Sequence, residues 1–370
     1  MRPPCPPVAF AAIAAAITLA GCAVPPPPVP DPTGRADADM LRVLTAFQRS
    51  GAQPIPNLTV AQARSQPTPG DAAAAVAQAM GMPAKMPLAS VRDIQVGGAA
   101  GMLPARVYDP QAARGPAPVI LYFHGGGWVT GTLDTYDASD RALAQGTGAI
   151  VVSVQYRLGP ENRFPAAQDD AIASYAWLTQ NAGSLGGDPR QIALAGESAG
   201  GNLAIDTAIA ARDHGLPRPV HELLVYPVAG TDLQTPSYQQ TPTAVPLNRA
   251  AIKWYVDHFT NGPADLQDPR LNVVGAANLA GLPPTTIVSA EIDPLRSEGE
   301  LLAAKLQAAG VPVEQRTYPG VTHEFFGMGA VVGQAKAAED FANMRLRASF
   351  TQPMQGMPAP HGRAARQRAG

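Results

Sequence analysis

A serine flanked by small residues is the first feature of this sequence that could carry out chemistry. The run Gly-Glu-Ser-Ala-Gly occupies residues 196–200, after an apolar segment at 192–195 and before a segment of helical pattern that opens at Ala199. A sharp turn from strand to helix is strained, and small neighbours let the serine stand clear of the sheet edge. The first turn of the helix also places its positive dipole end beneath a developing negative charge. The pattern therefore predicts that Ser198 is a nucleophile.

A serine nucleophile needs a general base, and the base needs an acid that orients it. Among the six histidines, His323 follows the last predicted strand, and Asp293 follows the strand before it. Ser198, Asp293 and His323 therefore form the predicted catalytic triad, in one of the known chain orders for such triads. Glu291 is a rival acid two residues before Asp293, and position along the chain does not by itself decide between them. We expect surface or capping roles for four other histidines: His214, His221, His258 and His361.

Three successive glycines follow another apolar segment. The run His124-Gly125-Gly126-Gly127-Trp128 comes directly after residues 119–123. Glycines let the backbone approach a substrate closely and direct several N–H groups at one point. A tetrahedral oxyanion needs such donors, so we expect an oxyanion hole made by Gly125, Gly126 and the N–H of Ala199. His124, Gly127 and Glu197 support the two motifs. A flexible turn or a phosphate loop is the alternative, but a phosphate loop would continue with Gly-Lys-Ser/Thr, which is absent.

The elements that must position these residues alternate between strand and helix. Apolar runs predict eight strands, at residues 91–96, 105–108, 119–123, 150–155, 191–195, 222–226, 285–290 and 313–318. Helical patterns lie near 136–145, 166–180, 199–213, 296–309 and 335–349. This alternation predicts an α/β fold with a mostly parallel eight-stranded sheet flanked by helices. No helix separates the first two strands, so we expect an antiparallel edge there.

Two segments depart from this alternation, residues 37–90 and residues 230–281. In the first, Met40, Leu44 and Phe47 are spaced to fall on one helix face. Insertions at the carboxyl ends of strands are where α/β folds build ligand sites. We therefore expect both segments to form a cap over the predicted nucleophile.

With these motifs together, the chain closely resembles the bacterial hormone-sensitive-lipase-like (family IV) carboxylesterases of the α/β-hydrolase superfamily. The resemblance covers about residues 37–350, and its further marks are the runs at 156–161, 164–166, 186–189 and 293–296 and Phe325 after His323. It implies an α/β-hydrolase fold with a helical cap, no cofactor and no metal. It also implies hydrolysis of short- to medium-chain carboxylic esters through an acyl-enzyme, with Asp293 rather than Glu291 as the acid.

The chain departs from the family pattern at three positions. Glu197 stands before the serine, where the family usually has Asp or Thr. Ser297 stands where an acid often follows the run at 293–296, and Glu324 stands where a glycine commonly follows the triad histidine. Glu324 places an acid beside His323, so substrate range or pH profile should differ. In the run at 156–161, we expect Tyr156, Arg157 and Glu161 to form a structural ion-pair network under the oxyanion loop.

The catalytic motifs are also compatible with functions other than ester hydrolysis. An amidase or an acyltransferase would use the same triad and the same acyl-enzyme. An inactive ligand-binding receptor on this scaffold is disfavoured, since a receptor has no need of an intact base. A structural envelope lipoprotein would leave three catalytic motifs unexplained.

The two ends of the chain predict export and anchoring. Residues 1–21 resemble a lipoprotein signal peptide: Arg2, an uncharged apolar run at 8–20, and then Leu-Ala-Gly before Cys22, the predicted lipidation site. Residues 22–36 form a Pro-rich linker, residues 37–350 the catalytic domain, and residues 351–370 a disordered tail. We expect a lipid-anchored protein of the cell envelope. Ala23, in place of Asp, favours the outer membrane.

Composition and net charge narrow the classes of molecule that the protein is expected to bind. The net charge is −2, from 27 Lys and Arg against 29 Asp and Glu, which offers no electrostatic reason to bind nucleic acid. Both cysteines, Cys5 and Cys22, precede the predicted domain, so the domain has neither a disulfide nor a cysteine metal site. The expected partners are a small-molecule ester and a membrane. Homodimerisation is left open.

Overall fold

A single mixed β-sheet organises the computed structural model, which describes Met1 and residues 29–83, 85–111 and 115–351. The strand order is β1-β2-β4-β3-β5-β6-β7-β8. β1 pairs antiparallel with β2 and β2 with β4, and all other pairs are parallel. The predicted eight strands and antiparallel edge are therefore confirmed. Their bounds are β1 Ser90–Gly98, β2 Gly101–Asp109, β3 Ala117–Phe123, β4 Ile150–Val154, β5 Gly187–Glu197, β6 Glu222–Val225, β7 Thr285–Ile292 and β8 Val313–Thr322.

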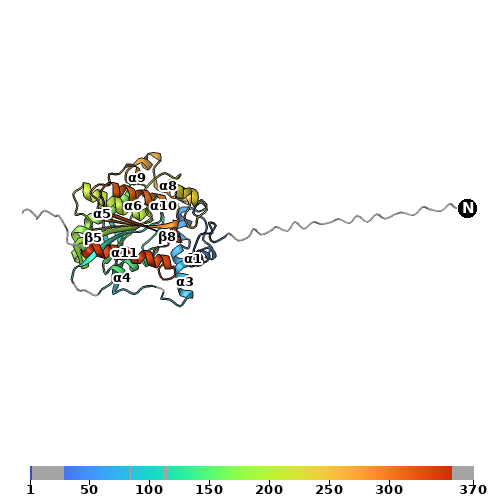
Figure 1. Cartoon of the computed structure of the whole chain (residues 1–370), viewed down its shortest axis with the longest axis horizontal. Helices are drawn as coiled ribbons and strands as arrows, with labels where there is room; N and C mark the ends of the chain where they lie inside the picture. Colours follow the sequence, from blue (N-terminus) through green and yellow to red (C-terminus); the bar gives the residue numbers. More distant parts are fainter. Residues whose placement is uncertain (2–28, 84, 112–114, 352–370) are drawn as a thin grey trace, which may run out of the picture.

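Helices cover both faces of the sheet. Figure 1 shows the sheet edge-on, with α5 (Ala166–Asn181), α6 (Ala199–Asp213) and α10 (Arg296–Ala308) on one side. On the other side lie α4 (Asp137–Thr147) and α11 (Gly333–Thr351). Every residue of β4 and β6 is buried, as expected for strands covered on both faces. This three-layer arrangement places the carboxyl ends of the parallel strands at one edge.

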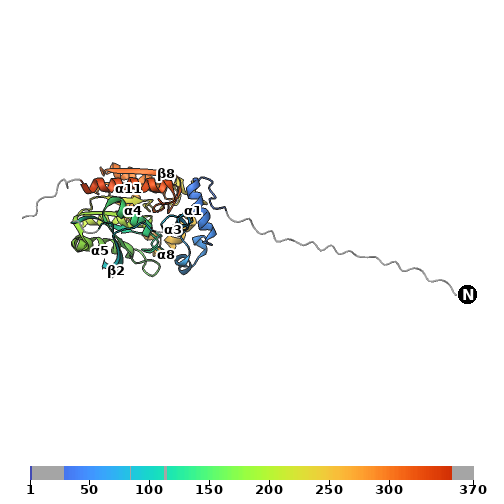
Figure 2. The same cartoon turned by 90° about the horizontal axis from the view of Figure 1, so that it is seen from below.

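The two segments outside the strand–helix alternation contact each other and line one cavity. The first supplies α1 (Ala38–Arg49), α2 (Val60–Ser65) and α3 (Pro69–Ala79), and the second supplies α7 (Pro236–Gln240), α8 (Arg249–Phe259) and α9 (Val273–Ala276). Figure 2 shows α1 and α3 side by side at one end of the molecule. Trp254 of α8 donates from its indole nitrogen to the carbonyl of Leu58, at 3.2 Å, and so links the two segments.

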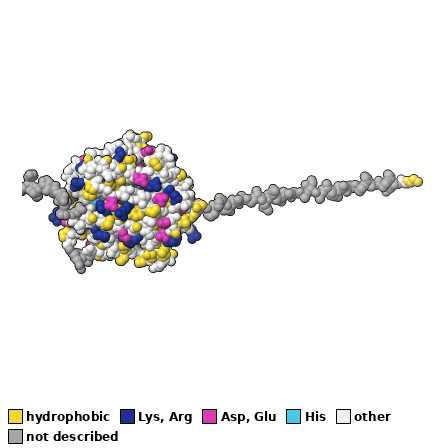
Figure 3. Space-filling model, viewed as in Figure 1, with side chains coloured by type: hydrophobic (Ala, Val, Ile, Leu, Met, Phe, Trp, Pro, Cys, Tyr) yellow, Lys and Arg dark blue, Asp and Glu magenta, His cyan; other side chains and the backbone are white. Residues whose placement is uncertain are grey.

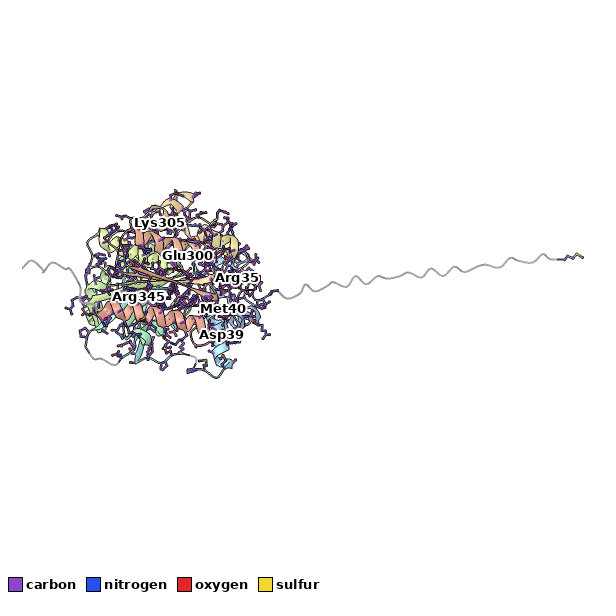
Figure 4. All side chains as sticks on the ribbon, in the orientation of Figure 1. Arg35, Asp39, Met40, Glu300, Lys305 and Arg345 are labelled. Carbon is purple, nitrogen blue, oxygen red and sulfur yellow. The ribbon has the colours of Figure 1, made fainter. Side chains whose placement is uncertain are left out.

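The first segment also belongs to the core of the domain. Met40 and Leu44 are fully buried in one cluster with Tyr318 and Phe325, and Phe47 packs against that cluster. Arg35 and Asp39, labelled with Met40 in Figure 4, both bind the body of the domain. Arg35 donates to the carbonyl of Glu291 at 3.4 Å, and Asp39 accepts from the N–H of Gly333 at 3.1 Å. This segment therefore cannot be a simple spacer.

Each of the three α-helices of the first segment begins at a side-chain cap. Asp37 accepts from the N–H of Met40, and Thr59 and Thr68 begin α2 and α3 with capping boxes. Asp31 accepts from the N–H groups of Thr33 and Ala36, so a folded turn already precedes α1, within residues assigned above to the linker.

The predicted signal peptide, Cys22 and the predicted tail from residue 352 onward lie outside the described residues. Among the residues that the structure describes, no helix combines the length and the apolar character needed to cross a bilayer. Figure 3 shows acidic and basic side chains interspersed with hydrophobic ones on the face in view, so that face has no extended patch of one sign.

Candidate active site

The predicted nucleophile lies in a tight turn between β5 and α6. Ser198 has φ 56° and ψ −118°, a conformation that L-residues rarely adopt. A Cβ atom on Gly196 would lie 2.1 Å from the carbonyl oxygen of Gly200, and one on Gly200 would lie 1.9 Å from that of Phe123. The close approach of β3, β5 and α6 therefore requires glycine at both positions. The strained serine is held at the carboxyl edge of the sheet.

The structure brings Ser198, His323 and Asp293 together in one chain of hydrogen bonds. His323 Nε2 lies 3.0 Å from Ser198 Oγ, and His323 Nδ1 lies 2.7 Å from Asp293 Oδ2. The other oxygen of Asp293 accepts from the N–H of Leu295 at 2.9 Å, which fixes the carboxylate. Asp293 and His323 follow β7 and β8, so parallel strands place the acid, the base and the serine at the same edge. In this arrangement Nδ1 donates to the acid and Nε2 can accept the serine proton.

Charges around the imidazole control its protonation. Burial by itself lowers the pKa of His323, but the nearby Asp293 carboxylate, with smaller contributions from Glu324 and Glu197, raises it above its usual value. The base is therefore a stronger proton acceptor than an isolated buried histidine.

Glu291, the rival acid, binds a different partner. Its carboxylate accepts from the N–H of Gly320 at 2.8 Å. Among the remaining histidines, His214 is exposed at the C-cap of α6, and His258 contacts the carbonyl of Trp254 through Nδ1. The expectation of a surface or capping role is wrong for His221, which is fully buried between Thr286 and Ser349. His361 lies outside the described residues.

The glycine run forms a loop beside Ser198. Gly126 and Gly127 have φ of 98° and 58° and line the same cavity as Ser198 and His323. The carbonyl of Gly126 accepts from the N–H groups of Val129 and Thr130, at 3.1 and 2.9 Å. Gly125 lies behind them, with its carbonyl 2.8 Å from His124 Nδ1. Within the part of the chain that the structure describes, the N–H groups of Gly125, Gly126 and Ala199 bind no protein acceptor, so all three predicted donors are available.

Two motif residues support the site from below. His124 stacks on Tyr156 with ring centroids 4.4 Å apart, and burial lowers its pKa to about 4, so the ring is neutral. Glu197 is buried, and its carboxylate accepts from the hydroxyls of Tyr122, at 2.6 Å, and Tyr226. Burial raises the pKa of Glu197 to about 7. Because Tyr226 packs on His323 with centroids 4.4 Å apart, Glu197 positions a wall of the site.

The charged residues of the run at 156–161 belong to two separate ion pairs rather than one network. Arg157 pairs with Asp170 of α5 through bonds of 2.8 and 2.9 Å. Glu161 pairs with Arg64 of α2 through bonds of 2.9 and 2.7 Å. Only Tyr156 lies directly under the oxyanion loop, where its hydroxyl donates to the carbonyl of His124 at 2.8 Å.

A cavity of about 560 Å³ opens over Ser198 and His323 and is lined by residues of both segments, 37–90 and 230–281. Sequence reasoning did not single out most of its walls. Arg64, Tyr136 and Leu247 all contribute, yet none belongs to a motif, because packing of distant segments and not local spacing brings them to the cavity. One weak indication of this cavity wall was present in the sequence, the apolar face of α1, because Leu44 and Phe47 on that face also line the cavity.

Comparisons with known proteins agree with this geometry. The profile of a family described as alpha/beta hydrolase fold matches residues 120–327. The chain is 45% identical over 240 residues to the carboxylesterase NlhH of Mycobacterium tuberculosis, covering 64% of this chain and 75% of that one. It is 42% identical over 265 residues to the esterase LipI of the same species, covering 70% and 81%. The solved hyperthermophilic esterase of the archaeon Pyrobaculum calidifontis is similar with a TM-score of 0.77 and 35% identity, over 85% and 98% of the two chains.

Proposed function

Because the chain belongs to the alpha/beta hydrolase family, we propose that it cleaves short- to medium-chain carboxylic esters through an acyl-enzyme on Ser198. Relatives named as carboxylesterases and esterases support hydrolysis of the ester bond itself. The observation that carries the mechanism is the chain of hydrogen bonds from Ser198 through His323 to Asp293, at 3.0 and 2.7 Å, at the floor of the cavity.

Acylation begins when Ser198 Oγ attacks the carbonyl carbon of the ester and its proton passes to His323 Nε2. The negative charge moves to the carbonyl oxygen, where the three predicted donors, the N–H groups of Gly125, Gly126 and Ala199, stabilise it. The tetrahedral intermediate collapses, the carbon–oxygen bond to the alcohol breaks, and His323 returns the proton to the leaving oxygen. Water then attacks the acyl-enzyme, with His323 again as the base, and releases the acid and free serine.

The test uses the purified domain and nitrophenyl esters of rising acyl length. Wild-type protein should turn over the short and medium esters, and addition of EDTA should leave the rate unchanged. Ser198→Ala should lower kcat by roughly 10⁴- to 10⁶-fold, because the members of a triad act as a unit. Ser184→Ala, at an exposed serine, is the matched control and should retain full activity. Substantial turnover by Ser198→Ala would refute the mechanism.

Anchoring in the cell envelope through lipidated Cys22 is a separate part of the proposal. Its support is the signal-like sequence that ends at Cys22. Several acyl chains on one cysteine hold a protein firmly at a membrane, whereas a single chain binds weakly. In fractionated cells, Cys22→Ser should move the enzyme from the membrane fraction to the soluble fraction. Cys5→Ser, a control within the same segment, should leave it in the membrane. Equal membrane association of both variants would refute anchoring at Cys22.

A further inference from the structure

Glu324 occupies a backbone conformation that favours glycine. Its φ is 69°, in the left-handed region, and it directly follows the triad histidine after β8. A non-glycine residue in that region is disfavoured, and such residues concentrate at functional sites. The side chain is therefore retained here against the preference of the backbone.

The Glu324 carboxylate faces the cavity that holds Ser198 and His323. Its two oxygens accept from the hydroxyl of Tyr136, at 2.8 and 3.1 Å. A Cβ atom on Gly125 would lie 2.4 Å from that hydroxyl, so the carboxylate lies beside the oxyanion loop. Among the described residues no second protein donor binds it, and a carboxylate offers about four acceptor positions. Glu324 therefore has acceptor capacity left for a bound molecule.

The walls of the cavity differ in chemistry. One group is apolar and packs as a cluster around α7 and α8: Tyr238, Leu247, Ala251 and Leu295. The other group is polar and lines the same cavity as Tyr136 and Glu324: Thr68, Asp71, Thr132 and Thr135. Gly70 and Thr135 bring the start of α3 to this polar wall, since a Cβ atom on Gly70 would lie 3.5 Å from the carbonyl of Thr135. A substrate with one apolar and one polar part would match both walls.

Resting on the proposed function, we infer that Glu324 selects esters whose alcohol part carries a hydrogen-bond donor, either a hydroxyl or a protonated amine. His323 Nε2 must reach the leaving oxygen in order to return the proton, so the alcohol leaves on the side of His323. Glu324 is the next residue and lines the same space. Arg64, an arginine that also lines the cavity, is bound to Glu161 and does not neutralise Glu324. The acyl chain lies against the apolar cluster.

The experiment compares kcat/KM within two pairs of butanoate esters that match in size. The first pair is 2-hydroxyethyl and propyl butanoate, and the second is 3-(dimethylamino)propyl and 4-methylpentyl butanoate. Wild-type enzyme should prefer the donor-bearing member of each pair. Glu324→Leu should lower both preferences by about tenfold, the size expected for one hydrogen bond to a charged acceptor. Glu324→Gln keeps an acceptor without the charge, so it should lose the amine preference and keep more of the hydroxyl preference.

Two further variants keep this test decisive. Glu324→Gly suits the backbone at φ 69° and should fold even where Leu does not, and it should lose both preferences. Asp340→Asn, at an exposed acid that does not line the cavity, should leave both ratios unchanged. If the wild type hydrolyses both members of each pair equally, or if Glu324→Gly keeps the ratios, the inference is refuted while the proposed function stands. If the wild type hydrolyses none of the four esters, the proposed function itself has failed.

Discussion

Replacing Arg64 with methionine should weaken the oxyanion loop from the cap side. Arg64 donates from Nε to the carbonyl of Val129 at 2.8 Å and from Nη2 to the carbonyl of Gly159 at 2.6 Å. Val129 in turn donates to the carbonyl of Gly126. Two hydrogen bonds, through Val129, therefore connect the Arg64 side chain with Gly126, whose N–H is a predicted oxyanion donor. Methionine keeps the apolar stem and removes every donor.

The expected loss of stability depends on how exposed the contacts of Arg64 are. The Arg64 side chain is 32% exposed and that of Glu161 is 58% exposed. An exposed ion pair contributes about 0–1 kcal/mol. Each bond from the guanidinium to a backbone carbonyl contributes about 1.5 kcal/mol, the lower end of the range for charged donors. Arg64→Met should therefore lower the free energy of unfolding by about 3 kcal/mol, and most of this loss comes from the carbonyl bonds.

The assay pairs urea unfolding with steady-state kinetics on a nitrophenyl ester. Arg64→Met should also lower kcat by about tenfold, less than the roughly 10²-fold that follows complete loss of an oxyanion donor. Glu161→Gln is the matched control, because it removes the ion pair and leaves both carbonyl bonds intact. It should cost less than about 1 kcal/mol and change kcat little. If Glu161→Gln were as damaging as Arg64→Met, the ion pair would be the important contact and this reasoning would be wrong.

Three other substitutions test the site. Glu324→Gln should move the acid limb of the kcat/KM–pH profile to lower pH. Burial lowers the pKa of His323, whereas Asp293 and then Glu324 raise it, so removal of the Glu324 charge should lower the pKa at which the imidazole loses its proton. A shift of the acid limb to higher pH would contradict this reasoning. Leu247→Trp, in the apolar wall, should shorten the preferred acyl chain in a nitrophenyl ester series, and an unchanged profile would exclude this wall as the acyl site. Gly200→Ala should abolish activity and lower the melting temperature, since its Cβ would meet the Phe123 carbonyl at 1.9 Å, whereas Gly183→Ala, in open space, should do neither.

Local sequence patterns were enough to predict the sheet, to identify Ser198 and His323, and to narrow the acid to Asp293 or Glu291. Alternation of apolar runs with helical segments determines a parallel sheet, because each strand must be covered on both faces. The glycines around Ser198 are required because a Cβ atom at these positions would clash with neighbouring backbone, so the sequence alone indicates the tight turn. Asp293 and His323 each follow a parallel strand, and such strands end at a common edge.

Only the tertiary structure decided which polar groups meet. Glu291 and Asp293 are two residues apart in the sequence, yet one binds the N–H of Gly320 and the other binds His323. His221 resembles any other histidine in the sequence, but packing buries it completely. Arg64 reaches the oxyanion loop from 65 residues away, and Tyr136 reaches Glu324 from 188 residues away. Such contacts depend on how distant segments pack, and no periodicity or spacing within one segment encodes them.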